Sequence, residues 1–241
     1  MTVSAYDEIA EWYDDSVNAS SLIHELVLPT LFDLMGNVEG LRVCDLACGQ
    51  GVVARHLATS GAAVVGVDTS ARLLDIAQRY DAEGSLGIVY QHDDAQTLAT
   101  LPDAAFDGVV CNLALMDIPD VAATFRAVHR IVRPQGWFVF SITHPCFQTP
   151  TSTWMDKADG TVWREVRGYF AEVFWRSDNR SGVRGQVGAY HRMLSTYVNA
   201  LVETGLCLER LCEPQARGRV AKRVPGYGEV PAVLVARCRK V

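Results

Sequence analysis

Short apolar runs alternate with amphipathic stretches along most of this chain. Tyr6, Ile9, Ala10 and Tyr13 recur at helical spacing, and together with the pattern that follows they predict two helices, over 6–17 and 21–35. The later pattern predicts strands at 41–46, 63–67, 86–91, 106–111 and 137–143 and helices at 52–60, 71–80 and 121–132. A helix at 188–204 and strands at 206–212 and 230–238 are predicted to close the chain, with a long loop at 213–229 between those strands. This β-α-β rhythm is typical of a parallel sheet covered by helices.

We therefore predict a single α/β domain over residues 1–241, built on a doubly wound, mostly parallel seven-stranded sheet. An N-terminal helical cap covers 1–38 and the core covers 41–143. An insertion follows the fifth strand at 144–189, and a C-terminal helix with the closing strands covers 190–241. A chain of 241 residues that is 49% hydrophobic can bury a core of this size.

The insertion breaks the rhythm, because the stretch between Thr143 and Gly188 has no clear helical period. It is rich in aromatic and basic residues: Phe147, Trp154, Trp163, Arg164, Arg167, Tyr169, Phe170, Phe174, Trp175, Arg176, Arg180 and Arg184. It leaves from the carboxyl end of a parallel strand, where α/β sheets bind ligands, and loops of this length are usually functional. We predict a substrate lid with a β-hairpin at 162–175. The alternative is a structural extension whose aromatic side chains pack on the core or form the contact of a homodimer.

Charge and cysteine content narrow the class of protein. The net charge of −6 disfavours a nucleic-acid partner, but residues 1–120 hold 4 Lys and Arg against 19 Asp and Glu, and residues 121–241 hold 18 against 9. The acidic half would suit a cationic ligand, and the basic half would suit a neutral or anionic ligand. Equally, the charges could be distributed by chance over solvated helix faces. No apolar run approaches the roughly 18 residues that span a membrane. Seven scattered cysteines without the companions of a zinc site predict no metal and a reducing, cytoplasmic location.

The chemistry is concentrated where the first two predicted strands end. The first strand runs into Asp45, a glycine-containing turn with Gly49 and Gly51 follows, and the second strand ends at Asp68. Glycines let the backbone approach a ligand closely, and an acidic residue after the second strand can accept hydrogen bonds from ribose hydroxyls. These residues predict a nucleoside-binding site. They also match the dinucleotide fingerprint, although a carboxylate before the glycines would repel a pyrophosphate and suits a cation.

The pattern Asp45-x-Ala47-Cys48-Gly49-x-Gly51 resembles the first motif of class I S-adenosylmethionine-dependent methyltransferases. The resemblance covers about residues 6–140 and the closing strands more loosely. It implies the class I fold, S-adenosyl-L-methionine as cofactor and S-adenosyl-L-homocysteine as product. It also implies that the core holds the cofactor.

Further positions match the family's pattern for holding the cofactor. Asp94-Ala95 matches the adenine position, with Asp93 as an alternative one residue earlier, and Asn112-Leu113 matches the position beside the reacting methyl group. Tyr13 resembles a residue of the helix that closes over the cofactor, although simple helix packing explains it nearly as well. The cofactor-binding residues implied by the resemblance are Tyr13, Asp45, Ala47, Gly49, Gly51, Asp68, Thr69, Asp94, Ala95, Asn112 and Leu113.

Two histidines are placed to act as a base if the methyl acceptor must lose a proton. His144 follows the fifth strand where the insertion begins, and His191 stands where it returns. Histidine can exchange protons near neutral pH, so both are candidate catalytic or substrate-binding residues, with a structural role as the alternative.

The sequence thus predicts a cytoplasmic methyltransferase acting on a small, planar or aromatic acceptor at oxygen, nitrogen or carbon. The chain has Asn112-Leu113-Ala114-Leu115 in place of the Asn/Asp-Pro-Pro-Tyr/Phe run that marks amino-group methylation of bases and protein glutamine. Two other classes remain open. One is an RNA or protein methyltransferase that docks through the basic C-terminal half, and the other is a catalytically silent protein that only binds the cofactor.

Overall fold

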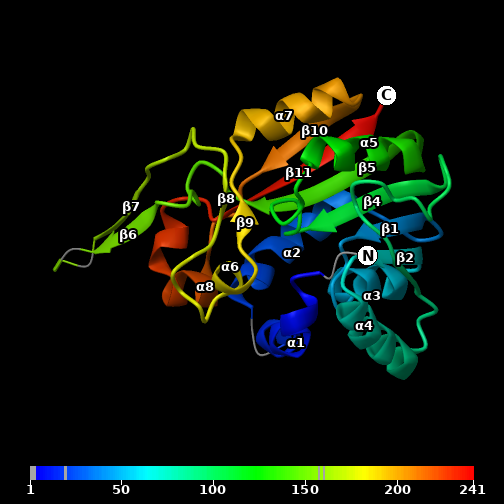
Figure 1. Ribbon diagram of the computed structural model, residues 1–241, viewed down its shortest axis with the longest axis horizontal. Coiled ribbons are helices and arrows are strands. Elements are labelled where there is room, and N and C mark those ends of the chain that lie inside the picture. Colours follow the sequence, from blue (N-terminus) through cyan, green and yellow to red (C-terminus); the bar gives the residue numbers. More distant parts are fainter. Residues whose placement is uncertain (1–3, 19–20, 157, 160) are drawn as a thin grey trace.

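The computed structural model describes residues 4–18, 21–156, 158–159 and 161–241, so parts of the predicted cap (1–3, 19–20) and insertion (157, 160) lie outside the described residues. A seven-stranded sheet lies between two layers of helices, in the order β10-β11-β5-β4-β1-β2-β3 (Figure 1). Its strands are β1 (Arg42–Leu46), β2 (Ala63–Asp68), β3 (Val89–His92), β4 (Phe106–Asn112), β5 (Val132–Thr143), β10 (Leu206–Cys212) and β11 (Val233–Lys240). β1 to β5 pair in parallel, and β11 runs antiparallel to both of its neighbours. The predicted fold class is confirmed.

Each strand of the sheet centre buries both of its faces, because side chains alternate between them. On β5, Phe138, Phe140 and Ile142 pack in one core with helices α5 and α7, whereas Trp137 and Val139 pack in the other with α2 and α3. The helices are η1 (Asp7–Ile9), α1 (Ala10–Asn18), α2 (Leu22–Met35), α3 (Val52–Thr59), α4 (Ala71–Gly84), α5 (Val121–Ile131), α6 (Val183–Gln186), α7 (Leu194–Glu203), α8 (Gly218–Arg223) and η2 (Pro225–Gly228). Strands that are apolar on both faces, like β5, are expected of parallel sheets with helices on both sides.

The residues that follow β2 show how the sequence starts a helix next to the strand ends. The Ser70 hydroxyl accepts a hydrogen bond from the amide of Leu73 (3.1 Å) and so caps α4. Asp120 caps α5 in the same way through the amide of Ala123 (2.8 Å). Both caps fix short connections, so the ends of β2 and β4 stay close to the helices that follow them.

The insertion is where the sequence-based prediction was least accurate. Its short strands are β6 (Thr153–Asp156), β7 (Val162–Glu165), β8 (Phe174–Trp175) and β9 (Ala189–Tyr190). The hairpin predicted at 162–175 was wrong, since β7 pairs with β6 and β8 pairs with β9. The helix predicted from 188 begins only at Leu194, because residues 189–190 are held in a strand, and the predicted loop 213–229 contains α8 and η2.

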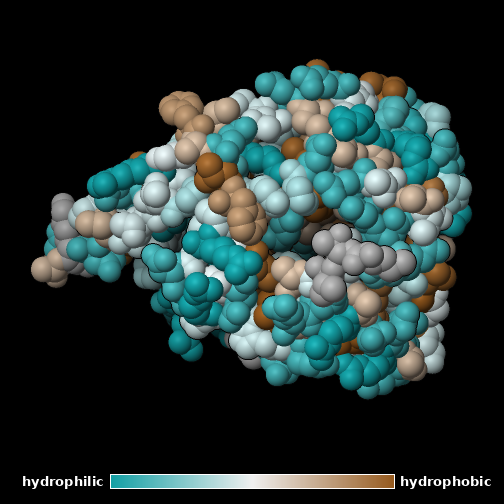
Figure 2. Space-filling view, in the orientation of Figure 1, coloured by the Kyte–Doolittle hydropathy of each residue, from teal (hydrophilic) through white to brown (hydrophobic). Residues whose placement is uncertain are grey.

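The β6–β7 hairpin projects from one end of the molecule, and the return of the insertion through β8, α6 and β9 lies against the carboxyl edge of the sheet (Figure 1). Hydrophobic side chains occur on the surface of this region, and Phe170 and Phe174 are among its exposed residues (Figure 2). Across the described residues, no helix is both long and apolar enough to cross a membrane.

Candidate functional site

The turn after β1 has an unusual backbone that brings peptide groups to the edge of the sheet. Ala47 (φ 53°), Gly49 (φ 53°) and Gly51 (φ 79°) all take left-handed conformations, and Gly51 precedes the first residue of α3. β1 lies between β4 and β2, the point at which the strand order reverses. Ligands of open α/β sheets bind at the carboxyl ends of the strands at this point.

Three adjoining hollows of about 170, 130 and 40 Å³ meet at Ala47, which lines all of them. We call them together the strand-end cavity. Ten residues predicted from the sequence line it: Tyr13, Asp45, Ala47, Gly49, Asp68, Thr69, Asp94, Ala95, Asn112 and Leu113. The local motifs and the folded structure therefore identify the same place.

Gly51 is the exception among the predicted cofactor-binding residues. It does not line the cavity; a Cβ at this position would come within 2.5 Å of the Tyr90 hydroxyl and 3.3 Å of Ala77. Its φ of +79° and this packing explain why glycine is needed. Gly49 is different, because a Cβ there would meet no protein atom closer than 3.9 Å.

Asp68 is held by the backbone on both sides of the turn. Its Oδ2 accepts a hydrogen bond from the amide of Gly49, and its Oδ1 accepts one from the amide of Ser70, each at 2.8 Å. Burial raises the pKa of this carboxyl group, and the backbone hydrogen bonds oppose that rise. A carboxylate oxygen can accept two hydrogen bonds, so both oxygens retain capacity for ligand hydroxyls at the cavity wall.

Asp45 lies in the smallest hollow with Tyr13 and is only 2% exposed. Burial raises its pKa to about 8, an effect opposed by the backbone amide of Ala54. Its Oδ2 makes no hydrogen bond to any described residue. A buried carboxyl oxygen without a partner is costly, and a cationic group in the adjoining hollow would satisfy it.

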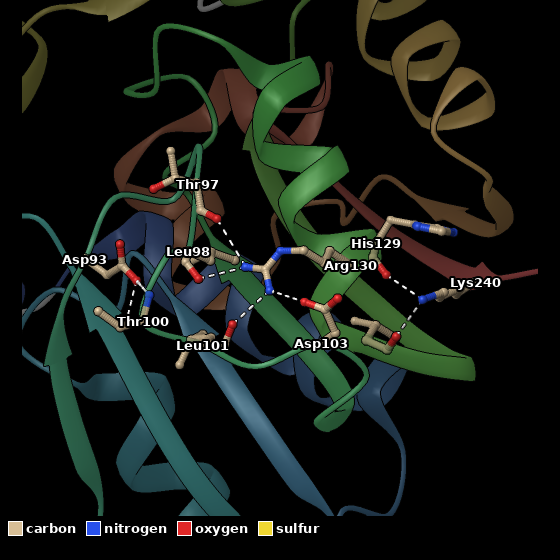
Figure 3. A network of polar contacts seen from close by, with 10 residues as sticks. Asp93, Thr97, Leu98, Thr100, Leu101, Asp103, His129, Arg130 and Lys240 are labelled. Carbon is tan, nitrogen blue, oxygen red and sulfur yellow. Dashed lines mark hydrogen bonds and ion pairs between the residues drawn. The ribbon is translucent and has the colours of Figure 1, made fainter.

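The loop after β3 separates the roles of Asp93 and Asp94. Asp93 Oδ2 accepts hydrogen bonds from the amide (2.7 Å) and hydroxyl (2.6 Å) of Thr100, closing the loop (Figure 3). Asp94 bonds to Gln96 and, like Asp93, lines the strand-end cavity. Both carboxylates accept hydrogen bonds within the loop, but Asp93 is buried and Asp94 is partly exposed, so Asp94 is the carboxylate better placed for a ligand.

Arg130 of α5 fixes the far side of the same loop. Its guanidinium donates to the carbonyl oxygens of Leu98 and Leu101, each at 2.8 Å, and of Thr97 at 3.2 Å, and it pairs with Asp103 (Figure 3). Three carbonyl groups of an irregular segment are thus satisfied by one side chain. This arrangement gives the loop a defined conformation beside the cavity.

At the end of β4, Ser141 of the neighbouring strand β5 fixes the orientation of Asn112. The Ser141 hydroxyl accepts a hydrogen bond from the amide of Leu113 (2.9 Å) and donates to Asn112 Oδ1 (2.7 Å). Leu113 takes a left-handed conformation with φ 53°. Asn112 therefore keeps its NH₂ group as a donor at the cavity, where a polar ligand group can accept from it.

Sequence reasoning missed a contact that joins three separate segments over the cavity. Arg184 of α6 forms an ion pair with Asp117 of the segment after β4, and the Tyr6 hydroxyl donates to Asp117 Oδ2 (3.2 Å). Asp117 and Tyr6 both line the strand-end cavity. Burial raises the pKa of Asp117, and Arg184 opposes the rise. No local motif marks these residues; the acidic and basic charges of the two halves of the chain were the only signal.

A second cavity of about 230 Å³, the insertion cavity, lies between the insertion and the sheet edge. Ala189 lines both cavities, and Arg184, which pairs with Asp117 of the first, lines the second. Other residues that line the insertion cavity include Gln148, Ser152, Arg164, Trp175, Tyr190, His191, Arg192 and Tyr197. The two cavities are therefore neighbours, and β9 contributes to both.

The two candidate histidines occupy different environments. His191 lines the insertion cavity, and its Nε2 donates a hydrogen bond to the carbonyl oxygen of Tyr169 (2.8 Å), which leaves Nδ1 as the ring nitrogen available to a ligand. His144 lines neither cavity: its Nε2 bonds to Glu213 (2.6 Å) and its Nδ1 accepts from the amide of Cys146 (3.2 Å). Burial lowers the pKa of His144, and Glu213 opposes this. His144 was predicted to lie at the substrate site, but it lies outside both cavities.

Known proteins resemble this chain in sequence and fold. A family model described as a methyltransferase domain matches residues 44–140. Two proteins named ubiquinone biosynthesis O-methyltransferase are similar: one from Bordetella avium, 33% identical over 55% of this chain and 56% of its own length, and one from Alkalilimnicola ehrlichii, 32% identical over 58% of each. This chain therefore spans little more than half the length of these relatives. A solved S-adenosylmethionine dependent methyltransferase from Mesorhizobium loti is 31% identical, covers 91% of this chain and 100% of its own, and superposes with a TM-score of 0.78.

Proposed function

The chain belongs to the S-adenosylmethionine-dependent methyltransferase family, and from that premise we propose that it transfers a methyl group to a small molecule held in the insertion cavity. The observation that carries this proposal is the adjacency of the two cavities. One is lined by the cofactor motif, the other by residues of the insertion, and Ala189 lines both. An acceptor in the second cavity would face a cofactor in the first.

Each part of the strand-end cavity fits one part of the cofactor. Asp68 would accept hydrogen bonds from the ribose hydroxyls, and Asp94 with Ala95 would hold the adenine. Asp45 and Asn112 would hold the charged methionine end, where the unpartnered Oδ2 of Asp45 supplies a buried acceptor for an ammonium group. This donor and acceptor set suits a nucleoside without phosphate, because Asp45 would repel a phosphate group.

The bound cofactor supplies a methyl group on a sulfonium, an electrophile that already has a good leaving group. The chain's residues then have to align the acceptor and exclude water. Residues of the insertion line both cavities, and Asp117 joins Arg184 of the insertion to Tyr6 of the N-terminal segment. We propose that the insertion is the substrate lid, with Trp175, Tyr190 and Tyr197 as apolar walls for a planar acceptor.

The names of the relatives support an oxygen acceptor, and an acceptor hydroxyl must lose its proton. We propose His191 as the base, because it lines the insertion cavity and its Nδ1 is not used in the hydrogen bond to Tyr169. His144 would act as a positioning residue, since its bond to Glu213 ties the start of the insertion to the segment after β10. All seven cysteines are free, which fits the proposed reducing, cytoplasmic location.

The proposal is tested by following a labelled methyl group. Purified protein is incubated with S-adenosylmethionine carrying a deuterated methyl group and with an extract separated into small molecules, RNA and protein. We expect label in a small molecule, identified by mass spectrometry, and no transfer by the Gly49→Val variant. Label found only in RNA or protein would contradict the small-molecule acceptor. Cofactor binding without any transfer would indicate a catalytically silent binding protein.

A further inference from the structure

The insertion cavity carries an excess of positive charge. Arg164, Arg184 and Arg192 line it together with His191, and no aspartate or glutamate is among its lining residues. This contrasts with the whole chain, whose net charge is −6. The positive charge of the basic second half of the chain is thus present at this cavity without a compensating carboxylate in its lining.

Arg164 and Arg192 have no carboxylate partner among the described residues. Arg192 is 8% exposed, and its guanidinium donates to the carbonyl oxygens of Leu115, Ile118 and Pro119 and lies over the rings of two tyrosines, Tyr190 and Tyr197. Arg164 is partly buried, and its burial lowers its pKa. A buried charge is costly unless it is paired, so two guanidinium groups in one cavity favour an anion there.

The neighbours of Arg164 leave donors free at one end of the cavity. Its Nε donates to the carbonyl oxygen of Phe147 (2.9 Å), and its Nη2 donates to Gln148 Oε1 (3.1 Å) and to Ser152 Oγ (2.6 Å). The bond at Oε1 fixes the Gln148 amide, whose Nε2 is buried and makes no hydrogen bond to a described residue. Arg164 Nη1 likewise has no hydrogen-bond acceptor among the described residues. Both groups are donors, which an anion with two oxygens would satisfy.

From this cluster we propose that the methyl acceptor is a small aromatic acid whose carboxylate binds Arg164 and Gln148. The inference rests on the proposed function, because it specifies the ligand of the same cavity. Trp175, Tyr190 and Tyr197 provide the apolar surface for the ring. The Arg164 cluster belongs to the insertion cavity alone, whereas Ala189 lines both cavities. The carboxylate therefore lies at the Arg164 cluster, and the accepting group faces Ala189 and the cofactor.

A carboxylate fits this cluster better than a phosphate does. The free donors of Arg164 and Gln148 match the two oxygens of one carboxylate. A phosphate dianion brings three acceptor oxygens and a higher charge, and it would leave one oxygen unsatisfied at this end. Binding of phosphate monoesters is therefore a separate outcome of the test.

The test compares acids with neutral partners of the same shape. Calorimetry on protein saturated with S-adenosylhomocysteine is run with 4-hydroxybenzoate, 3-hydroxybenzoate and 4-hydroxycinnamate, each beside its primary amide, and with 4-hydroxyphenyl phosphate. The acid should bind about 10- to 100-fold more tightly than its amide in at least one pair, as a charge-assisted hydrogen bond provides. Equal affinity of acid and amide in every pair, or tighter binding of the phosphate ester than of any acid, would overturn the proposal.

Variants show whether the preference comes from this cluster. Arg164→Gln and Gln148→Met should each reduce the preference for the acid and leave the affinity for S-adenosylhomocysteine unchanged. Arg167→Gln is the matched control, because Arg167 lies in the same insertion, pairs with Glu165 and does not line the cavity. If Arg164→Gln does not fold, as judged by circular dichroism, Gln148→Met alone decides. A preference that survives in the folded variants contradicts the proposal, whereas failure of native protein to bind S-adenosylhomocysteine would contradict the proposed function instead.

Discussion

Arg184 and Asp117 lie 67 residues apart in the sequence and form an ion pair beside the strand-end cavity, which Asp117 lines. Their side chains are 23% and 17% exposed, and Arg184 also donates to the carbonyl oxygen of Gly188 (3.0 Å). Tyr6 completes the contact from the N-terminal segment. The pair thus connects the insertion, the loop after β4 and the N-terminus at the site where the cofactor would be enclosed.

Removing one member of this pair should cost more than removing both. Arg184→Gln leaves Asp117 buried without its cation, and we expect the free energy of unfolding to fall by about 3 kcal/mol. Adding Asp117→Asn should restore part of that loss, because no unpaired charge remains. Urea denaturation of both variants measures this, with exposed Arg176→Gln as the control. An additive loss in the double variant would show that the two residues do not interact.

Substitution of the two glycines of the turn should affect different properties, cofactor binding for one and stability for the other. Gly49→Ala adds a methyl group that points toward the cavity, with strain only from φ +53°, so the protein should fold and lose cofactor binding. Gly51→Ala adds one 2.5 Å from the Tyr90 hydroxyl, so stability should fall while binding in the folded fraction is largely retained. Thermal unfolding and calorimetry on both variants separate the two effects. The reverse outcome would exchange their assigned roles.

Binding of a cationic cofactor should release a proton from Asp45. Its pKa of about 8 in the free protein means that the carboxyl is mostly protonated at pH 6.5, and a bound ammonium group favours its ionised form. The affinity should therefore rise with pH between 6 and 7.5, by up to about tenfold per pH unit. Calorimetry at pH 6.5 in buffers of different ionisation enthalpy counts the released protons. Asp45→Asn should abolish the release; equal release by native protein and variant would contradict the assignment.

The two histidines should also differ in kinetics. His191→Gln should lower kcat by about 10²- to 10⁴-fold for a hydroxyl acceptor, without changing cofactor affinity. His144→Gln should mainly reduce stability through the lost bond to Glu213. Measurement of kcat and of the unfolding temperature for native protein and both variants decides between them. A larger loss of kcat in His144→Gln would return the role of base to that residue.

Much of the site could be predicted because its determinants are local. Asp45 and Asp68 lie in the last two residues of their strands and Gly49 follows the first of these strands, and the geometry of parallel strands brings such residues together. The sequence does not distinguish Gly51 from Gly49, because a glycine required by its φ and by contact with Tyr90 has the same sequence signature as one required by a ligand.

The insertion could not be predicted in the same way. Its strands are two to four residues long and pair with distant partners, such as Phe174 with Tyr190, so periodicity has too few positions to detect them. The apolar spacing after Gly188 also fits a helix, and only the pairing of β9 with β8 excludes one there. The ion pair of Arg184 with Asp117 depends on this tertiary arrangement and leaves no local pattern.

The central claim is that the strand-end cavity binds S-adenosylmethionine, and calorimetry of the native protein with S-adenosylhomocysteine and with NAD tests it most directly. The unpartnered Oδ2 of Asp45 and the ribose position of Asp68 predict a dissociation constant for S-adenosylhomocysteine of about 1 μM or lower, with negligible binding of NAD. Tighter binding of NAD, or no measurable heat with S-adenosylhomocysteine, would contradict the account.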